Sequence, residues 1–175
     1  MLVNLTDIFS SEQKVETKEI AWDADTVTVG DASYDILEKA PVILTLKNIG
    51  KGRALVKANT SFTLQLPCDR CLKPVKYSME IAAEEEVISP EYADEIALDA
   101  EQTGFMDGYQ LKVDDLIYSD IVLNWPMKIL CREDCKGICR ICGKDLNTGE
   151  CGCDTFVPSP GLAGIKEIFN ANKEV

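Results

Sequence analysis

The chain has 175 residues, of which 46% are hydrophobic and 27% are charged, a composition typical of a folded globular protein. This length allows one ordinary domain with a small satellite segment and excludes two large domains. The sequence contains no histidine, which excludes histidine general bases, Ser-His and Cys-His nucleophiles and mixed Cys/His metal sites.

The N-terminal segment, Met1 to Ser10, has neither a basic region nor an uninterrupted apolar run. We therefore expect no signal peptide and no membrane span, and we expect a cytoplasmic protein. Because the cytoplasm keeps thiols reduced, the eight cysteines of this chain indicate metal binding before disulfides.

A β-meander is predicted for the first half of the chain. Residues 1–40 are expected to form loops and one peripheral strand, at Thr26–Val29, where apolar and polar residues alternate. Pro41–Ile49 is rich in β-branched residues and Arg53–Leu66 alternates, so the two segments are predicted to form an antiparallel hairpin. Pro74–Ile88 is predicted as the third strand.

An acidic loop and a helix are predicted to follow the meander. The formal net charge is −12, and residues 77–111 contain ten Asp and Glu residues but no Lys or Arg, which predicts a loop near 89–108. Apolar residues at helical spacing then predict a helix from Val113 through Asn124 that packs on the sheet. Met127–Leu130 is predicted as a short strand.

The predicted fold class is α+β: an antiparallel β-meander with a packed helix and a C-terminal Cys-rich zinc-binding segment. We expect residues 1–125 to form the body of sheet and helix. Residues 126–175 are expected to form a zinc-binding tail that is linked through metal to Cys68 and Cys71, with a short helix at 162–169.

Eight cysteines form four close pairs, and all eight are predicted metal ligands. The pairs are Cys68-x2-Cys71, Cys131-x3-Cys135, Cys139-x2-Cys142 and Cys151-x-Cys153. A tetrahedral ion needs four sulfurs at about 2.3 Å, and a two-residue spacer turns both sulfurs of a pair toward one point. Gly143 can adopt the positive φ that such a knuckle requires. Four pairs predict two tetrathiolate sites, with zinc as the preferred metal.

Loop length favours one grouping of these pairs. Cys139, Cys142, Cys151 and Cys153 lie within a short loop, whose closure costs little entropy, so they are expected to share one ion. The second ion would then join the Cys68/Cys71 pair to the Cys131/Cys135 pair. Exchange of Cys131/Cys135 with Cys151/Cys153, or a single zinc with spare thiols, stays open. A saturated tetrathiolate site has no open coordination position, which indicates a structural role.

Other uses of the cysteines are considered beside structural zinc. Cys68 and Cys71 have the spacing of a redox pair, although such pairs usually begin a helix and this one joins two predicted strands. An iron–sulfur cluster also needs four thiolates, but the run ending in Cys-Pro is absent. We interpret the interleaved basic residues as offsetting the charge of the thiolate sites, with a phosphate-binding face as the alternative. These are Lys128, Arg132, Lys136, Arg140 and Lys144.

Two motifs together resemble the YceD family, the large ribosomal RNA subunit accumulation proteins. They are Cys68-Asp-Arg-Cys71-Leu72 and the stretch from Cys131 to Asn147, which ends in C-x-x-C-G-x-D-L-N and precedes a closing C-x-C. The likeness covers most of the chain, including the meander, the acidic middle and the helix.

The resemblance implies a non-enzymatic, cytoplasmic assembly factor for the accumulation or processing of large-subunit (23S) ribosomal RNA, without catalytic residues. The implied partner is the large-subunit precursor, contacted through a basic ribosomal protein or through rRNA, with no membrane and no small-molecule substrate. The acidic run is either a solvated loop or the docking surface for such a basic partner. The alternatives are a thiol-disulfide redox protein that uses Cys68 and Cys71, and a zinc-dependent interaction module unrelated to ribosomes.

Overall fold

The computed structural model describes residues 1–92 and 104–153, which form two compact units. We call Met1–Leu66 with Pro74–Ile129 the body, and Pro67–Lys73 with Leu130–Val175 the cysteine unit. The predicted C-terminal helix and much of the predicted acidic loop lie outside the described residues.

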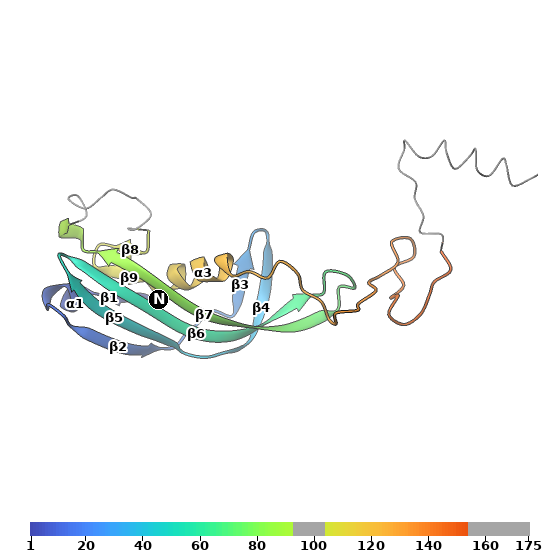
Figure 1. Cartoon of the computed structure of the whole chain (residues 1–175), viewed down its shortest axis with the longest axis horizontal. Helices are drawn as coiled ribbons and strands as arrows, with labels where there is room; N and C mark the ends of the chain where they lie inside the picture. Colours follow the sequence, from blue (N-terminus) through green and yellow to red (C-terminus); the bar gives the residue numbers. More distant parts are fainter. Residues whose placement is uncertain (93–103, 154–175) are drawn as a thin grey trace, which may run out of the picture. The chain divides into compact units, whose positions relative to one another are not determined.

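The predicted β-meander is confirmed and is the centre of the body (Figure 1). It consists of β5 (Val42–Gly50), β6 (Arg53–Pro67) and β7 (Pro74–Ile88). β5 and β6 are antiparallel, with Ile43 opposite Asn59, and β7 also pairs with β6. Each strand enters the next through a short connection, so the turn between β6 and β7 carries the first cysteine pair.

The first 40 residues contain more regular structure than predicted. Besides the predicted strand β3 (Thr26–Val29), they form β1 (Leu2–Asn4), α1 (Thr6–Ser10), β2 (Val15–Ile20) and β4 (Ala32–Lys39). The strands of the large sheet follow the order β2-β5-β6-β4-β3. The prediction of loops was wrong here because β2 and β4 are only half-buried, so their apolar signal is weak.

A second, small sheet has the order β1-β9-β8 and leads into the predicted helix. β8 is Met106–Asp107, β9 is Gln110–Lys112, and α3 spans Val113–Leu123, which confirms the predicted helix. α3 packs against β7, also as predicted. The predicted strand at Met127–Leu130 is wrong, because those residues are irregular and the Met127 side chain is fully exposed.

The body has one continuous apolar core between the large sheet and α3. Strand alternation places every second residue inward, as for Leu44 and Leu46 on β5, which are fully buried while Ile43 is partly exposed. α3 contributes the buried residues Leu116, Ile117 and others to the same core. No helix in the described ranges is long and apolar enough to cross a membrane.

Candidate metal centres

The structure brings the eight cysteine sulfurs together in two groups of four. One group is Cys68, Cys71, Cys131 and Cys135, and the other is Cys139, Cys142, Cys151 and Cys153. In each group all four Sγ atoms lie within 4.8 Å of one another. This is the grouping that loop length favoured, and each group could hold a metal ion. The assignment of the eight thiols as ligands stays a prediction.

Sulfur spacing in the first group fits a shared ion. The Sγ atoms of Cys68 and Cys135 are 3.8 Å apart, and those of Cys71 and Cys131 are 3.5 Å apart. Four sulfurs about 2.3 Å from one ion at tetrahedral angles lie about 3.8 Å from each other, whereas a disulfide brings two sulfurs to about 2.05 Å. All eight cysteines are free thiols. The spacing therefore matches tetrahedral coordination and not disulfide pairing.

The first cysteine pair lies on a knuckle between β6 and β7. The N–H of Leu72 donates to the carbonyl of Cys68 at 2.9 Å, and the N–H of Cys68 donates to the carbonyl of Lys73 at 2.8 Å. Leu72 has φ +60°, the left-handed conformation that closes this tight turn. The turn directs the thiols of Cys68 and Cys71 toward the same point.

The second knuckle repeats this hydrogen-bond pattern. The N–H of Gly143 donates to the carbonyl of Cys139 at 2.9 Å, and the N–H of Cys139 donates to the carbonyl of Lys144 at 2.9 Å. Gly143 has φ +72°, so the prediction of positive φ at this glycine is confirmed. The N–H of Ile141 donates to Sγ of Cys139 at 3.4 Å, which stabilises a thiolate there.

Arg70 and Gly137 fasten the first knuckle to the later cysteines. The Arg70 guanidinium donates to the carbonyl of Cys135 at 2.5 Å, and the N–H of Ile138 donates to the carbonyl of Arg70 at 3.1 Å. A Cβ on Gly137 would lie 2.9 Å from that Arg70 carbonyl oxygen, and Gly137 has φ +80°. Glycine is therefore needed where the two segments meet.

Asn147 and Asp145 support the first group from beyond the second knuckle. The Asn147 side-chain N–H donates to Sγ of Cys135 at 3.4 Å, and its Oδ1 accepts the N–H of Lys136 at 2.8 Å. Asp145 forms a 2.6 Å ion pair with Lys73, which holds the pKa of Asp145 at about 2. Sequence reasoning assigned neither residue a role, although both belong to the D-L-N part of the motif.

The thiols of the second group lie so close together that their pKa values differ widely. Backbone N–H groups of Cys142 and Ile141 lower the pKa of Cys139 to about 6. Hydrogen bonds to Cys142 and Cys151 raise the pKa of Cys153 to about 12. Four adjacent thiols cannot all ionise alone, because each new thiolate repels the others. A divalent cation removes this conflict, so metal binding would release protons.

The cysteine unit has little else to hold it together. Among its described residues, the only buried ones are Cys68, Cys71, Cys135, Cys139 and Gly137. Every member of the apolar core belongs to the body. The two sulfur groups thus occupy the place that an apolar core takes in other small domains.

Two kinds of comparison relate the chain to known proteins. It is 26% identical over 103 residues to an uncharacterized protein of Mycobacterium bovis and to uncharacterized proteins of two Mycobacterium tuberculosis strains. Each alignment covers 59% of this chain and 49% of the relative, so the chain spans about half the length of the curated relatives it matches. No solved structure matches the chain.

The family comparison covers the site. The model of the family described as "Large ribosomal RNA subunit accumulation protein YceD" matches residues 56–169, a segment that includes most of β6, all of β7 and α3, and all eight cysteines. This segment is more than half of the chain and carries both motifs on which the resemblance was based. The chain therefore belongs to the YceD family.

Proposed function

We propose that this protein is a non-enzymatic, cytoplasmic binding factor that promotes accumulation or processing of large-subunit (23S) ribosomal RNA. The observation that carries the proposal is the family match over residues 56–169. Family membership suggests a role related to accumulation of large-subunit RNA, and the free thiols of this chain suit a reducing compartment. The non-enzymatic mode of action and the identity of the partner are proposed in addition to this family role.

Two zinc ions are proposed to complete the cysteine unit. Zinc suits sites made entirely of thiolates at tetrahedral spacing, and four protein ligands per ion leave no position for water or substrate. The metal would supply folding energy and charge compensation for the thiolates. This arrangement supports a structural role for all eight cysteines.

The redox alternative is less well supported. Reactive Cys-x-x-Cys pairs usually have an accessible thiolate at a helix N-terminus. Here Cys68 and Cys71 are buried, lie between two strands and stand within a four-sulfur group. Catalytic turnover of a dithiol substrate by the zinc-loaded protein would reverse this preference.

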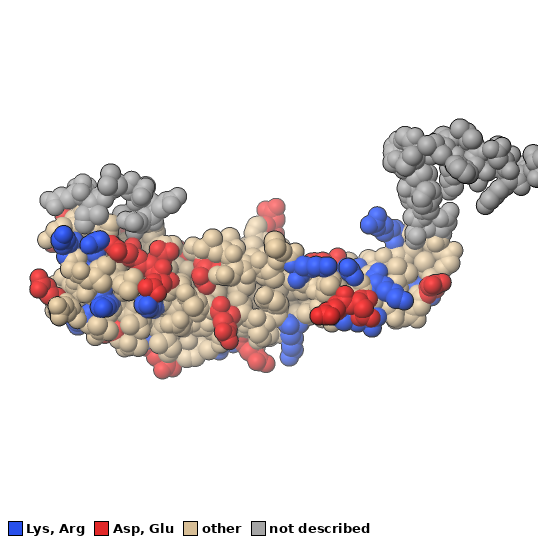
Figure 2. All heavy atoms as spheres, viewed as in Figure 1, with Lys and Arg blue, Asp and Glu red and all other residues tan. Residues whose placement is uncertain are grey.

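Charge distribution favours a basic protein over RNA as the direct partner. The body contains 22 Asp and Glu but ten Lys and Arg residues, and the cysteine unit contains eight of each. Figure 2 shows both kinds of charge on the surface. Each zinc bound by four thiolates adds about two negative charges, so the field of the whole chain would repel phosphates. The proposed contact with the large-subunit precursor is therefore a basic ribosomal protein.

Depletion of the protein tests the proposed function. We expect the amount of mature 23S rRNA to fall relative to 16S rRNA, because only large-subunit maturation is proposed to need the factor. Re-expression of the wild-type chain should restore the ratio, and both rRNAs can be quantified from total RNA. An unchanged ratio after depletion would reject the proposal and favour an interaction module unrelated to ribosomes.

A further inference from the structure

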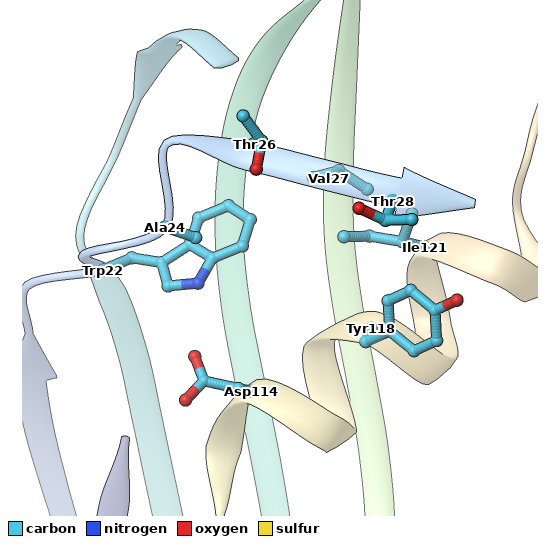
Figure 3. A pocket seen from close by; sticks show the side chains of 8 residues that line it. All are labelled: Trp22, Ala24, Thr26, Val27, Thr28, Asp114, Tyr118 and Ile121. Atoms are coloured by element: carbon cyan, nitrogen blue, oxygen red, sulfur yellow. The ribbon is translucent and has the colours of Figure 1, made fainter. Parts of the chain in front are cut away.

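The body contains a pocket of about 350 Å³ between α3 and the segment that leads into β3. Figure 3 shows its lining side chains, with Trp22 and β3 on one side and α3 on the other. The volume is at the lower end of ligand-pocket sizes and suits one or two side chains of a partner. Neither metal centre contributes a residue to it.

The pocket wall is aromatic and apolar, and it carries one charged group. Trp22, Val27 and Ile121 are almost fully buried and form apolar wall, whereas Tyr118 is 46% exposed at the rim. Asp114 is the charged residue among those that line the pocket, and its side chain is 48% exposed. In the view of Figure 3, the nitrogen-bearing edge of the Trp22 indole faces this carboxylate.

This chemistry matches a long cationic side chain. The aliphatic stem of a lysine or arginine packs well on indole and phenol rings, and its charged end can pair with a carboxylate at the rim. The ammonium group of Met1 already pairs with Oδ2 of Asp114, so this carboxylate accepts a cation in the folded protein. A partner cation would approach through Oδ1 or replace that ammonium group.

The surroundings strengthen the preference for a cation. Two exposed acidic residues, Asp23 and Asp25, are next in sequence to the lining residues Trp22, Ala24 and Thr26. The ammonium group of Lys39 is held by Asp25 at 3.1 Å and by the carbonyl of Ala24 at 2.7 Å. RNA phosphates would meet net negative charge here, whereas a basic peptide would be attracted.

We propose that this pocket is the docking site for a basic segment of a large-subunit ribosomal protein, which inserts a lysine or arginine side chain between Trp22 and Tyr118. The partner's identity rests on the proposed function, whereas the pocket's preference for a cation rests on its lining. An adjacent basic residue of the segment would face Asp23, which sets orientation and speeds association.

The test uses the zinc-loaded full chain labelled with ¹⁵N and overlapping 15-residue peptides from the basic proteins of the large subunit. The chain has two tryptophans, so the indole N–H signal of Trp22 reports on the pocket and that of Trp125, which does not line it, serves as internal control. We expect at least one peptide to shift the Trp22 signal saturably, and to bind more weakly at about 0.5 M salt.

Matched variants locate the contact. Asp114→Asn and Thr26→Lys should each weaken peptide binding about tenfold or more, because one removes the carboxylate and the other adds a competing cation. Asp115→Asn and Thr26→Val should stay within about twofold, since Asp115 lies outside the lining and valine keeps the shape of threonine. Thermal unfolding of each variant verifies the fold, which matters for Asp114→Asn because it also loses the pair with Met1.

Three results would overturn the proposal. They are the absence of any Trp22 shift with the peptides, a Trp22 shift with 23S rRNA oligonucleotides but not with peptides, and equal weakening by Asp114→Asn and Asp115→Asn. If depletion lowers 23S rRNA but no peptide binds the pocket, the docking proposal is rejected and the proposed function is kept. Peptide binding with unchanged 23S rRNA would reject the ribosomal origin of the occupant.

Discussion

The interior of the body and the interior of the cysteine unit are stabilised by different kinds of residue. The body buries leucine, isoleucine and valine side chains between a sheet and a helix. The described part of the cysteine unit buries four cysteines and one glycine instead. An apolar core stabilises a fold without any ligand, whereas clustered thiols repel one another until a cation joins them. We therefore expect the body to fold without metal and the cysteine unit to fold only with metal.

Metal removal should have the largest effect of all the changes considered, because it should unfold the cysteine unit and leave the body folded. Structural zinc contributes on the order of 10 kcal/mol in small modules, comparable to the stability of a whole domain. We expect amide signals of residues 130–153 to collapse to unfolded positions after chelation, while the indole signal of Trp22 in the body core keeps its native position. Readdition of zinc should restore the spectrum, with two zinc atoms per chain by elemental analysis.

Two outcomes would contradict the expected difference in metal dependence between the two units. Dispersed signals from the cysteine unit in metal-free protein would show that the sulfurs are not needed as metal ligands. Loss of the native Trp22 signal after chelation would show that the body also depends on metal. If elemental analysis found iron instead of zinc, the cysteine unit would still depend on metal, but the proposed identity of the ion would be wrong.

A cavity in the core should affect the body and spare the cysteine unit. Leu44 is fully buried, so Leu44→Ala should lower the free energy of unfolding by about 2–5 kcal/mol. The control is Ile43→Ala on the opposite face of the same strand, where the side chain is 37% exposed and the cost should be smaller. Urea unfolding followed by tryptophan fluorescence measures both. Equal losses of unfolding free energy in the two variants would contradict the assignment of Leu44 to the inward face of β5. The zinc content of both variants should equal that of the wild-type chain.

Removal of a group that supports the sulfurs should weaken metal binding at one site. Asn147→Ala removes the hydrogen bond to Sγ of Cys135 and should lower zinc affinity of the first group about 10- to 100-fold. Thr148→Ala is the control, because within the described residues this exposed side chain donates to the carbonyl of Asp145 and to no sulfur. Competition with a chromophoric chelator measures both affinities. Equal affinities in the two variants would show that Asn147 only shapes the loop.

Much of this architecture could be predicted from local sequence signals. Alternation in β5 and β6 has period two over long, strongly apolar runs, and the residues of α3 have helical spacing, so both patterns indicate their structure directly. The sulfur grouping was also predictable, because Cys139 and Cys153 close a short loop and leave the other four cysteines to pair with each other.

The remainder depends on contacts between distant segments. β2 has apolar residues only at its two ends, so its strand state depends on pairing with β5, in which Val15 lies opposite Lys47. Asn147 supports Cys135 only because the second knuckle folds back toward the first group. Local propensity carries no information about either contact.

The two knuckles offer the finest comparison, since they share two backbone hydrogen bonds but have different residues directly after the second cysteine. Gly143 is where Leu72 stands in the first knuckle, and both residues have positive φ. The left-handed conformation costs a non-glycine residue about 1–2 kcal/mol, while glycine costs roughly 0.5–1 kcal/mol through the entropy of the unfolded chain. The balance favours glycine by about 0 to 1.5 kcal/mol, and the midpoints of the two ranges correspond to a few-fold change in affinity.

Leu72→Gly should therefore tighten zinc binding at the first group by a few-fold, because we expect metal binding to order the knuckle. Gly143→Ala should weaken the second group by a similar factor, since a Cβ there meets no atom within 4 Å and only backbone strain is added. Leu72→Ala is the control: it removes most of a side chain that is 65% exposed but keeps the backbone cost. If Leu72→Ala tightens binding as much as Leu72→Gly, the exposed side chain and not the left-handed backbone distinguishes the two knuckles.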